Sequence, residues 1–251
     1  MIYHYLKIAF RNLIKYKTQS IVSIVGLAIG FTCFALSALW IRYEMTYDNF
    51  HEGADRIYLV RAHYANEPGT SKFTPYPLMK YLQDKMPEIE ATASTSIYRD
   101  MKFRMGDNEQ EVVMATADSV FMNFFNIQLL KGTVNFLKEN DPEIAITEEF
   151  ARKLFGSEED ALGKEVELSG RPRKIGAIVS GWSRHSNIPY SVLSSARRYP
   201  RWSSKGEQLF IRVRAGVDRD TFQKKMEDID ILDIPKESEL AKLLITPISA
   251  L

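Results

Sequence analysis

The feature that most constrains this chain is an apolar run near its N-terminus. Residues 21–41 are twenty-one consecutive residues without a charged side chain. At about 1.5 Å per residue, a helix of this length is roughly 30 Å long, which matches the hydrocarbon thickness of a bilayer. The apolar part of a secretory signal peptide is usually only about 7–15 residues long. We therefore predict a transmembrane helix over residues 20–46 rather than a cleaved leader.

The charges on either side of this run predict its orientation. Residues 1–19 contain no acid and carry the basic side chains Lys7, Arg11, Lys15 and Lys17. Residues 42–56 carry two basic side chains and the four acids Glu44, Asp48, Glu52 and Asp55. Because positively charged flanks stay in the cytoplasm, we expect the N-terminus inside and the chain after Glu44 exported.

The first nineteen residues predict a cytoplasmic amphipathic helix. Apolar residues recur at helical spacing from Leu6 to Ile14, and Lys7, Arg11 and Lys15 form a separate stripe at i, i+4 and i+8. A basic amphipathic helix ahead of a span is suited to lie along the inner leaflet. The same pattern serves a tail that only sets topology and a helix that contacts a partner, and both interpretations stay open.

The remainder of the chain has the composition of a globular protein. Charged residues make up 26% of the chain and hydrophobic residues 45%, with a net charge of +1, which gives no indication of a nucleic-acid partner. The exported part is about 200 residues long, enough for one large domain or two small ones. The single cysteine, Cys33, lies in the predicted span. The exported core must therefore fold without disulfides.

Two separated parts of the exported chain predict the same β-α-β order. In the first, a helix that begins near Pro77 lies between two strands, and in the second a helix capped by Asp218 does so. The four predicted strands are residues 57–64, 91–98, 207–214 and 243–248. Together they predict an α+β fold: a split, porter-like sandwich of the ferredoxin-like kind, with its helices on one face of the sheet.

Residues 101–205 lie between these two units and predict an inserted α/β subdomain. Its clearest signals are a strand leading into a helix that Thr147 caps and Gly156 follows, and a hairpin that turns at Ser169-Gly170. Residues 196–206 predict a mobile loop. The predicted domains are a cytoplasmic helix over 1–19, a transmembrane helix over 20–46 and a core domain over 47–251.

The sequence assigns no catalytic, cofactor or metal site. It contains no Walker A phosphate-binding loop, so the chain cannot hydrolyse ATP by that mechanism. Ser183, His185 and Ser186 are close together, but no nucleophile elbow and no acid at a recognisable position accompany them. The four histidines are scattered without metal-ligand spacing. We expect that the protein is not an enzyme.

Two glycines in the predicted span indicate a helix-packing face. Gly26 and Gly30 form a GxxxG motif, with Ser23 one turn earlier. Small residues let a second helix approach closely, and lipid gives no other reason to place two glycines in a span. We expect this face to contact another transmembrane helix.

Five stretches resemble the N-terminal half-repeat of MacB-type ABC permeases, a group that includes the lipoprotein-releasing permeases and FtsX-like proteins. They are LKIAFRNLIKYKTQSIVSIVGLAIGF (6–31), YEMTYDNFHEGADRIYLV (43–60), ITEEFARKLFG (146–156), ALGKEVEL (161–168) and SNIPYSVL (186–193). They extend over nearly the whole chain, and the first two are the most specific. The chain departs from many relatives at Asn187, where they have His, and at Ser191, where they have Asp.

The resemblance implies a permease subunit in the bacterial inner membrane, with a MacB-like core domain in the periplasm. Such permeases dimerise, sit on a cytoplasmic ABC ATPase that binds the ATP, and transmit ATP-driven motion to the periplasm for export or for lipoprotein or antimicrobial efflux. A periplasmic or outer-membrane protein is a further expected partner. Three more membrane helices would follow in such a permease, so we expect this chain to be a fragment or a truncated product.

A second interpretation stays open at this point. A chain with one span and a periplasmic core also suits a membrane-anchored interaction module that has no transport activity of its own.

The charge asymmetry about the span yields a topology prediction. A reporter enzyme that is active only after export should be active when fused after Leu251 and inactive when fused after Thr18. Enzyme activity in intact cells is the measurement, with immunoblots to show equal expression of the two fusions. The reverse pattern of activities would contradict the predicted orientation.

Overall fold

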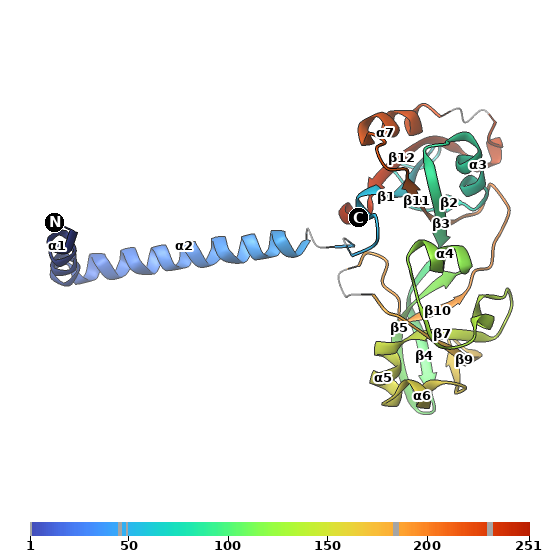
Figure 1. Cartoon of the computed structure of the whole chain (residues 1–251), viewed down its shortest axis with the longest axis horizontal. Helices are drawn as coiled ribbons and strands as arrows, with labels where there is room; N and C mark the ends of the chain where they lie inside the picture. The colour runs from blue at the N-terminus through green and yellow to red at the C-terminus, as the bar shows by residue number, and fades with distance from the viewer. Residues whose placement is uncertain (1, 45–46, 49, 183–185, 230–232) are drawn as a thin grey trace. The chain divides into compact units, whose positions relative to one another are not determined.

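Figure 1 shows a computed structural model of the chain, which describes residues 2–44, 47–48, 50–182, 186–229 and 233–251. Its contacts divide the chain into two compact units, Met1–Thr46 and Tyr47–Leu251.

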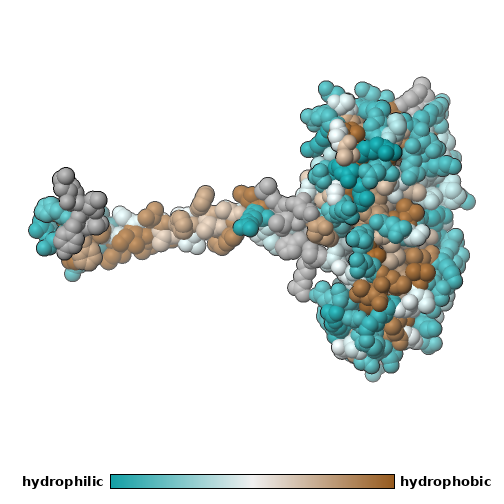
Figure 2. Space-filling view, in the orientation of Figure 1, coloured by the Kyte–Doolittle hydropathy of each residue, from teal (hydrophilic) through white to brown (hydrophobic). Residues whose placement is uncertain are grey.

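The N-terminal unit consists of two helices, α1 (Ile2–Lys15) and α2 (Lys17–Glu44), which meet at Tyr16. α2 is 28 residues long and has no buried residue. It is long and apolar enough to cross a membrane, judged by length and composition. Apolar side chains extend along it in Figure 2. An apolar helix with no buried residue is suited to a lipid surrounding.

The second unit is built on a sheet of ferredoxin-like order. Its main strands are β1 (Ile57–Tyr64), β3 (Ile89–Thr95), β11 (Lys205–Val213) and β12 (Leu240–Pro247). They lie in the order β12-β1-β11-β3 with every neighbouring pair antiparallel, and the short β2 (Thr74–Pro75) pairs with the start of β11. The helices are α3 (Pro77–Lys85) and α7 (Arg219–Glu227). The predicted α+β class and the split β-α-β arrangement are confirmed.

Both helices cover one face of this sheet. Successive residues of a strand point to opposite faces, so Tyr58, Val60 and Ala62 of β1 lie on the same side. They share an apolar core with Leu82 of α3 and Phe222 of α7. Asp218 caps α7 as predicted, since its carboxylate accepts a hydrogen bond from the Thr221 amide at 2.9 Å.

The chain between β3 and β11 forms a second sheet with its own helices. Its strands are β4 (Ile97–Met105), β5 (Asn108–Ala117), β6 (Leu129–Gly132), β7 (Glu143–Thr147), β8 (Glu165–Leu168), β9 (Arg171–Val179) and β10 (Val192–Ser195). Its helices are α4 (Ser119–Phe124), α5 (Glu148–Phe155) and α6 (Glu158–Ala161). The strand order is β6-β9-β7-β10-β5-β4-β8, and β8 also pairs with β9, so six strands close into a ring.

One apolar core is shared by the two sheets. Ile57, Leu59 and Phe210 point away from α3 and α7 and belong to the same buried cluster as Phe121 of α4 and Leu193 of β10. The ferredoxin-like sheet is therefore covered on its second face by part of the insertion. Within the described residues, four short 3₁₀ helices complete the fold, at Ala54–Arg56, Val134–Leu137, Lys236–Ser238 and Ile248–Ala250.

Two local predictions in the insertion are confirmed. Ser169 and Gly170 have φ values of 48° and 79°, the left-handed pair that a two-residue hairpin turn requires. Thr147 caps α5, because its hydroxyl accepts a hydrogen bond from the Phe150 amide at 3.3 Å, and Gly156 ends the helix with φ 85°.

The single strand predicted over residues 91–98 is wrong. β3 ends at Thr95 and β4 begins at Ile97, so Ser96 separates two strands in different sheets. The main chain of Ser96 is held by Thr116 of β5, whose hydroxyl accepts from the Ser96 amide at 2.8 Å and whose amide donates to the Ser96 carbonyl at 3.0 Å. The small and β-branched residues of 91–98 continue without a break, so the sequence gave no indication that the chain passes from one sheet to the other at Ser96.

The shared core predicts that residues 47–251 unfold in one cooperative transition. Removal of the fully buried Phe210 ring by Phe210→Ala should lower the free energy of unfolding by about 3–5 kcal/mol. Tyr199→Ala removes an exposed ring and should change it by less than about 0.5 kcal/mol. Urea denaturation followed by circular dichroism and by tryptophan fluorescence measures both. Two separate transitions would show that the sheets fold independently.

Candidate functional site

The predicted helix-packing residues lie together on an open face of α2. A Cβ atom built on Gly26 or Gly30 would meet nothing within 4 Å, so packing within the chain does not require glycine there. Spacings of three and four residues place Ser23, Cys33 and Ser37 on the same face. These small residues form one stripe along the helix. That a second helix packs on it stays a prediction.

The predicted basic stripe lies on α1. Lys7, Arg11 and Lys15 are exposed and four residues apart, which places them along one side of the helix. Of the apolar residues, Phe10 and Ile14 are also exposed. α1 therefore presents both a basic and an apolar surface, and its contact with a membrane surface stays a prediction.

A buried carboxylate lies at the start of the core unit and was not predicted. Asp48 is fully buried. It accepts three hydrogen bonds: from the Ser186 hydroxyl at 2.5 Å, from the Asn187 amide at 2.9 Å and from Asn187 Nδ2 at 3.1 Å. Its φ of 53° is left-handed, a conformation that Asp tolerates better than most residues.

These contacts fasten the segment that follows α2 to a distant loop. Burial of a carboxylate is costly unless hydrogen-bond donors replace water, and the three donors to Asp48 do so. Ser186 is fixed in turn, because its hydroxyl also accepts from the Ile188 amide at 3.0 Å. Because Asp48 and Ser186 are 138 residues apart, the bond between them ties the start of the core unit to a loop far along the chain. We call these residues (Asp48, Ser186 and Asn187) the anchor.

An aromatic cluster surrounds the anchor. The ring of the buried His51 lies 4.2 Å from the Phe50 ring, 4.9 Å from the Trp182 ring and 5.0 Å from the Phe125 ring, measured between centroids. His51 Nε2 is 3.6 Å from Asp48 Oδ1. Sequence spacing gave no reason to pair this histidine with an acid. In the structure, the His51 ring lies between Asp48 and the aromatic rings of Phe50, Phe125 and Trp182.

The loop that carries Ser186 and Asn187 is held by two further hydrogen bonds. The Trp182 indole donates to the Ile188 carbonyl at 2.8 Å, and the Tyr190 hydroxyl donates to the Ser180 carbonyl at 2.7 Å. Burial raises the pKa of Tyr190 above its ordinary value, so this hydroxyl stays a donor at neutral pH. These two bonds hold the described residues on either side of the donors to Asp48.

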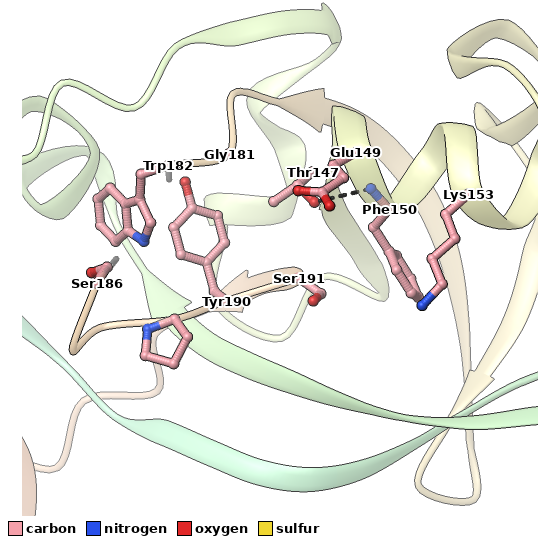
Figure 3. A pocket seen from close by; sticks show the side chains of 10 residues that line it. Thr147, Glu149, Phe150, Lys153, Gly181, Trp182, Ser186, Tyr190 and Ser191 are labelled. Carbon is pink, nitrogen blue, oxygen red and sulfur yellow. Dashed lines mark hydrogen bonds between the residues drawn. The ribbon is translucent and has the colours of Figure 1, made fainter. Parts of the chain in front are cut away.

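A small pocket of about 220 Å³ lies beside the anchor. Figure 3 shows Glu149 and Lys153 of α5 on one side and Trp182 and Tyr190 on the other. Ser191, the position where many relatives of the resembled group have Asp, also lines it. In the described part of the chain, no three His, Cys, Asp or Glu side chains gather as metal ligands would.

Of Ser183, His185 and Ser186, which the sequence does not assign to catalysis, the structure describes only Ser186. Ser183 and His185 lie outside the described residues. Ser186 is buried, and its hydroxyl donates to Asp48. A hydroxyl used in this way is not presented to a substrate as a nucleophile.

A second polar cluster joins the insertion to the ferredoxin-like sheet. The Arg198 guanidinium donates to Asp118 Oδ2 at 2.5 Å, to Glu207 Oε2 at 3.1 Å and to the Ser94 hydroxyl. It also lies 4.8 Å from the Tyr76 ring centroid. Burial raises the pKa of the Glu207 carboxyl, and the positive charge of Arg198 opposes this rise.

This cluster fixes part of the loop that was predicted to be mobile. Residues 196–204 form no helix or strand, in agreement with a loop. Arg198, near its start, is nevertheless hydrogen-bonded to Glu207 of β11 and to Asp118, the N-cap of α4.

Two anchor residues lie in stretches that resemble the family, although no sequence spacing relates these residues to each other. Asp48 lies in the stretch 43–60 and Asn187 in the stretch 186–193, and both stretches belong to the family resemblance. The structure shows that these stretches contact each other. The sequence indicates Asp48 only as one of the acidic residues that follow the span. Asn187, which departs from the residue common among relatives, still donates to it.

Comparisons with known proteins identify the family and the fold. A family model described as the MacB-like periplasmic core domain matches residues 20–229. No curated protein matches the chain. A solved domain from Porphyromonas gingivalis, assigned as part of a permease, is 22% identical, with a TM-score of 0.64 over 80% of this chain and 94% of its own.

Two further solved structures share the fold at 11% identity. The extracellular domain of YknZ, a noncanonical ABC-type transporter from Gram-positive bacteria, has a TM-score of 0.54 over 76% of this chain and 99% of its own. The periplasmic region of MacB from Actinobacillus actinomycetemcomitans has a TM-score of 0.52 over 77% of this chain and 89% of its own.

The anchor predicts a large effect of one substitution near the start of the core. Asp48→Ala leaves the donors of the buried Ser186 and the half-buried Asn187 unpaired, and should lower the free energy of unfolding of residues 47–251 by about 1–3 kcal/mol. Asp55→Ala removes an exposed acid from the same segment and should change it by less than about 0.5 kcal/mol. Urea denaturation measures both, and equal effects would show that the anchor adds no stability.

Proposed function

The chain belongs to the MacB-like periplasmic core domain family of ABC-type permeases, and from this membership we propose that it is a membrane subunit that transmits ATP-driven motion to the periplasm. The relatives' descriptions support this assignment: one is a MacB and another an ABC-type transporter. This motion would drive the export or efflux of a substrate, including lipoproteins or antimicrobial compounds. ATP would be bound by a separate cytoplasmic ABC ATPase.

The anchor is the observation that carries the proposal. α2 ends at Glu44, and Asp48 is already fixed in the core by three hydrogen bonds. Four residues of extended chain span at most about 14 Å. A larger displacement of the outer end of α2 must therefore pull on Asp48 and, through Ser186, on the insertion.

The proposed orientation places α1 in the cytoplasm and the core in the periplasm. The exposed stripe of Lys7, Arg11 and Lys15 would then face the anionic inner leaflet. Each cation near such a surface contributes about 1 kcal/mol of attraction. The inner membrane is the proposed location, with a cytoplasmic ATPase, a second permease and a periplasmic or outer-membrane protein as partners.

A distance measurement tests the transmission of motion. In a Cys33→Ser background, a spin label on Lys72→Cys reports the core, because Lys72 is exposed. With the cognate ATPase in nanodiscs, ATP and vanadate should shift the label-to-label distance between two permease copies. Asp48→Ala should abolish the shift while the ATPase stays bound. An unchanged distance in the parent protein with ATPase bound would favour the membrane-anchored interaction module instead.

The small-residue stripe of α2 predicts a native cysteine crosslink. Cys33 lies on the face of Gly26 and Gly30, so two copies that pack through this face bring their Cys33 thiols together. Mild copper-phenanthroline oxidation of membranes should yield a disulfide dimer on non-reducing gels. Gly26→Ile or Gly30→Ile should reduce its yield several-fold, because the larger side chains push the backbones apart.

A matched control moves the thiol to the other side of the same helix. In the variant Cys33→Ala, Ala35→Cys, the thiol is two residues away, which is about 200° around the helix. This variant should not crosslink. Equal crosslinking at both positions would show that α2 pairs by no defined face.

A further inference from the structure

A cleft of about 550 Å³ opens at one end of the six-stranded ring, and the proposed function makes no use of it. The strand directions place the starts of β7 and β9 and the ends of β5, β8 and β10 at this end. α5 begins at the opposite end, where β7 finishes. The volume lies in the range of ligand pockets, and the mouths of such rings are common binding sites.

The ring is incompletely paired where the cleft opens. Among the described residues, β8 pairs with β4 only at Phe103 and Arg104, which leaves Ile97 and Tyr98 without a strand on that side. β10 pairs with β7 only through Val192 and Leu193. The cleft is therefore bordered by strand edges whose main chain can bond to an extended ligand.

The charge of the cleft favours an anion. Arg171, Arg173 and Arg197 line it, against the single carboxylate of Asp141. Asp141 is already used within the chain, since its Oδ1 accepts from the Glu143 amide at 2.9 Å. Arg173 Nε is buried and has no hydrogen-bond partner among the described residues. Guanidinium groups bind carboxylates with two parallel hydrogen bonds, so the arginines suit acidic side chains.

The cleft also offers apolar and hydroxyl groups. Met101, Met114 and the exposed ring of Tyr98 lie in it, and Met, Tyr and Arg are the residues enriched at the centres of protein interfaces. Ser194 and Ser195 also line the cleft. Serine hydroxyls beside open strand edges suit a peptide main chain better than an alkyl chain.

We propose that this cleft binds an extended acidic segment of a partner protein. Carboxylates of the segment pair with Arg171 and Arg197 at the rim and with Arg173 inside. An apolar side chain of the segment packs on Met101 and Met114, and its main chain bonds to the free strand edges. The recognised feature is an alternation of acidic and apolar residues, because neighbouring side chains of an extended peptide point to opposite sides.

Peptide binding by the full chain in detergent micelles tests the proposal. The probe is a fluorescein-labelled octapeptide of alternating glutamate and leucine, followed by fluorescence anisotropy. We expect saturable binding, and no binding of the same peptide with lysine in place of glutamate. Arg171→Glu and Arg197→Glu should each weaken binding by at least about tenfold, the loss expected for a charge-assisted hydrogen bond.

The control is Arg201→Glu, an exposed arginine of the same loop that does not line the cleft. It should leave the affinity unchanged, and thermal melts should show that all three variants remain folded. Equal weakening by Arg201→Glu, or no saturable binding, would overturn the proposal. Displacement of the peptide by millimolar inorganic phosphate would indicate a simple anion site. Displacement by phosphatidylglycerol vesicles but not by phosphate would indicate a lipid site. Either displacement would contradict the proposal that the cleft binds a peptide.

Discussion

Much of the structure depends on the burial of one carboxylate. Asp48 is fully buried, so its carboxylate needs the donors of Ser186 and Asn187 in place of bulk solvent. That requirement fixes the first residues of the core unit against the distant loop that carries Ser186 and Asn187. Trp182 and the His51 ring then complete an apolar wall around the bonds, which excludes water and strengthens them. A polar interaction thus decides where the chain enters the core.

The sequence predicted the regular parts of the fold well, for physical reasons that can be named. The β-α-β units have long, alternating strands and capped helices, and these are local signals: Asp218 caps α7 and Thr147 caps α5. The short strands β2, β6 and β10 were missed, because two to four residues are too few to show a period. The change of sheet at Ser96 was missed because it is set by Thr116, which is distant in sequence.

The candidate site was less predictable than the fold. Gly26, Gly30 and the basic stripe could be found because helical spacing brings their members together. The anchor joins residues 138 apart, and the Arg198 cluster draws on four separate segments, so no spacing rule relates their members. The family resemblance marked the stretches 43–60 and 186–193, but it could not show that they touch. Contacts of high sequence separation come only from the folded structure.

The placement of the insertion has a consequence for how the domain can vary. β3 and β11 are antiparallel neighbours in the same sheet, so the whole insertion is, topologically, one very long hairpin loop. The entropy of closing a loop grows only slowly with its length, so the sheet's connectivity tolerates insertions of very different size. The shared core sets the opposite limit. Ile57, Leu59 and Phe210 would be bare if the loop were cut back to a tight turn. A different insertion can therefore replace this one only if it has an apolar surface that covers the second face of the ferredoxin-like sheet.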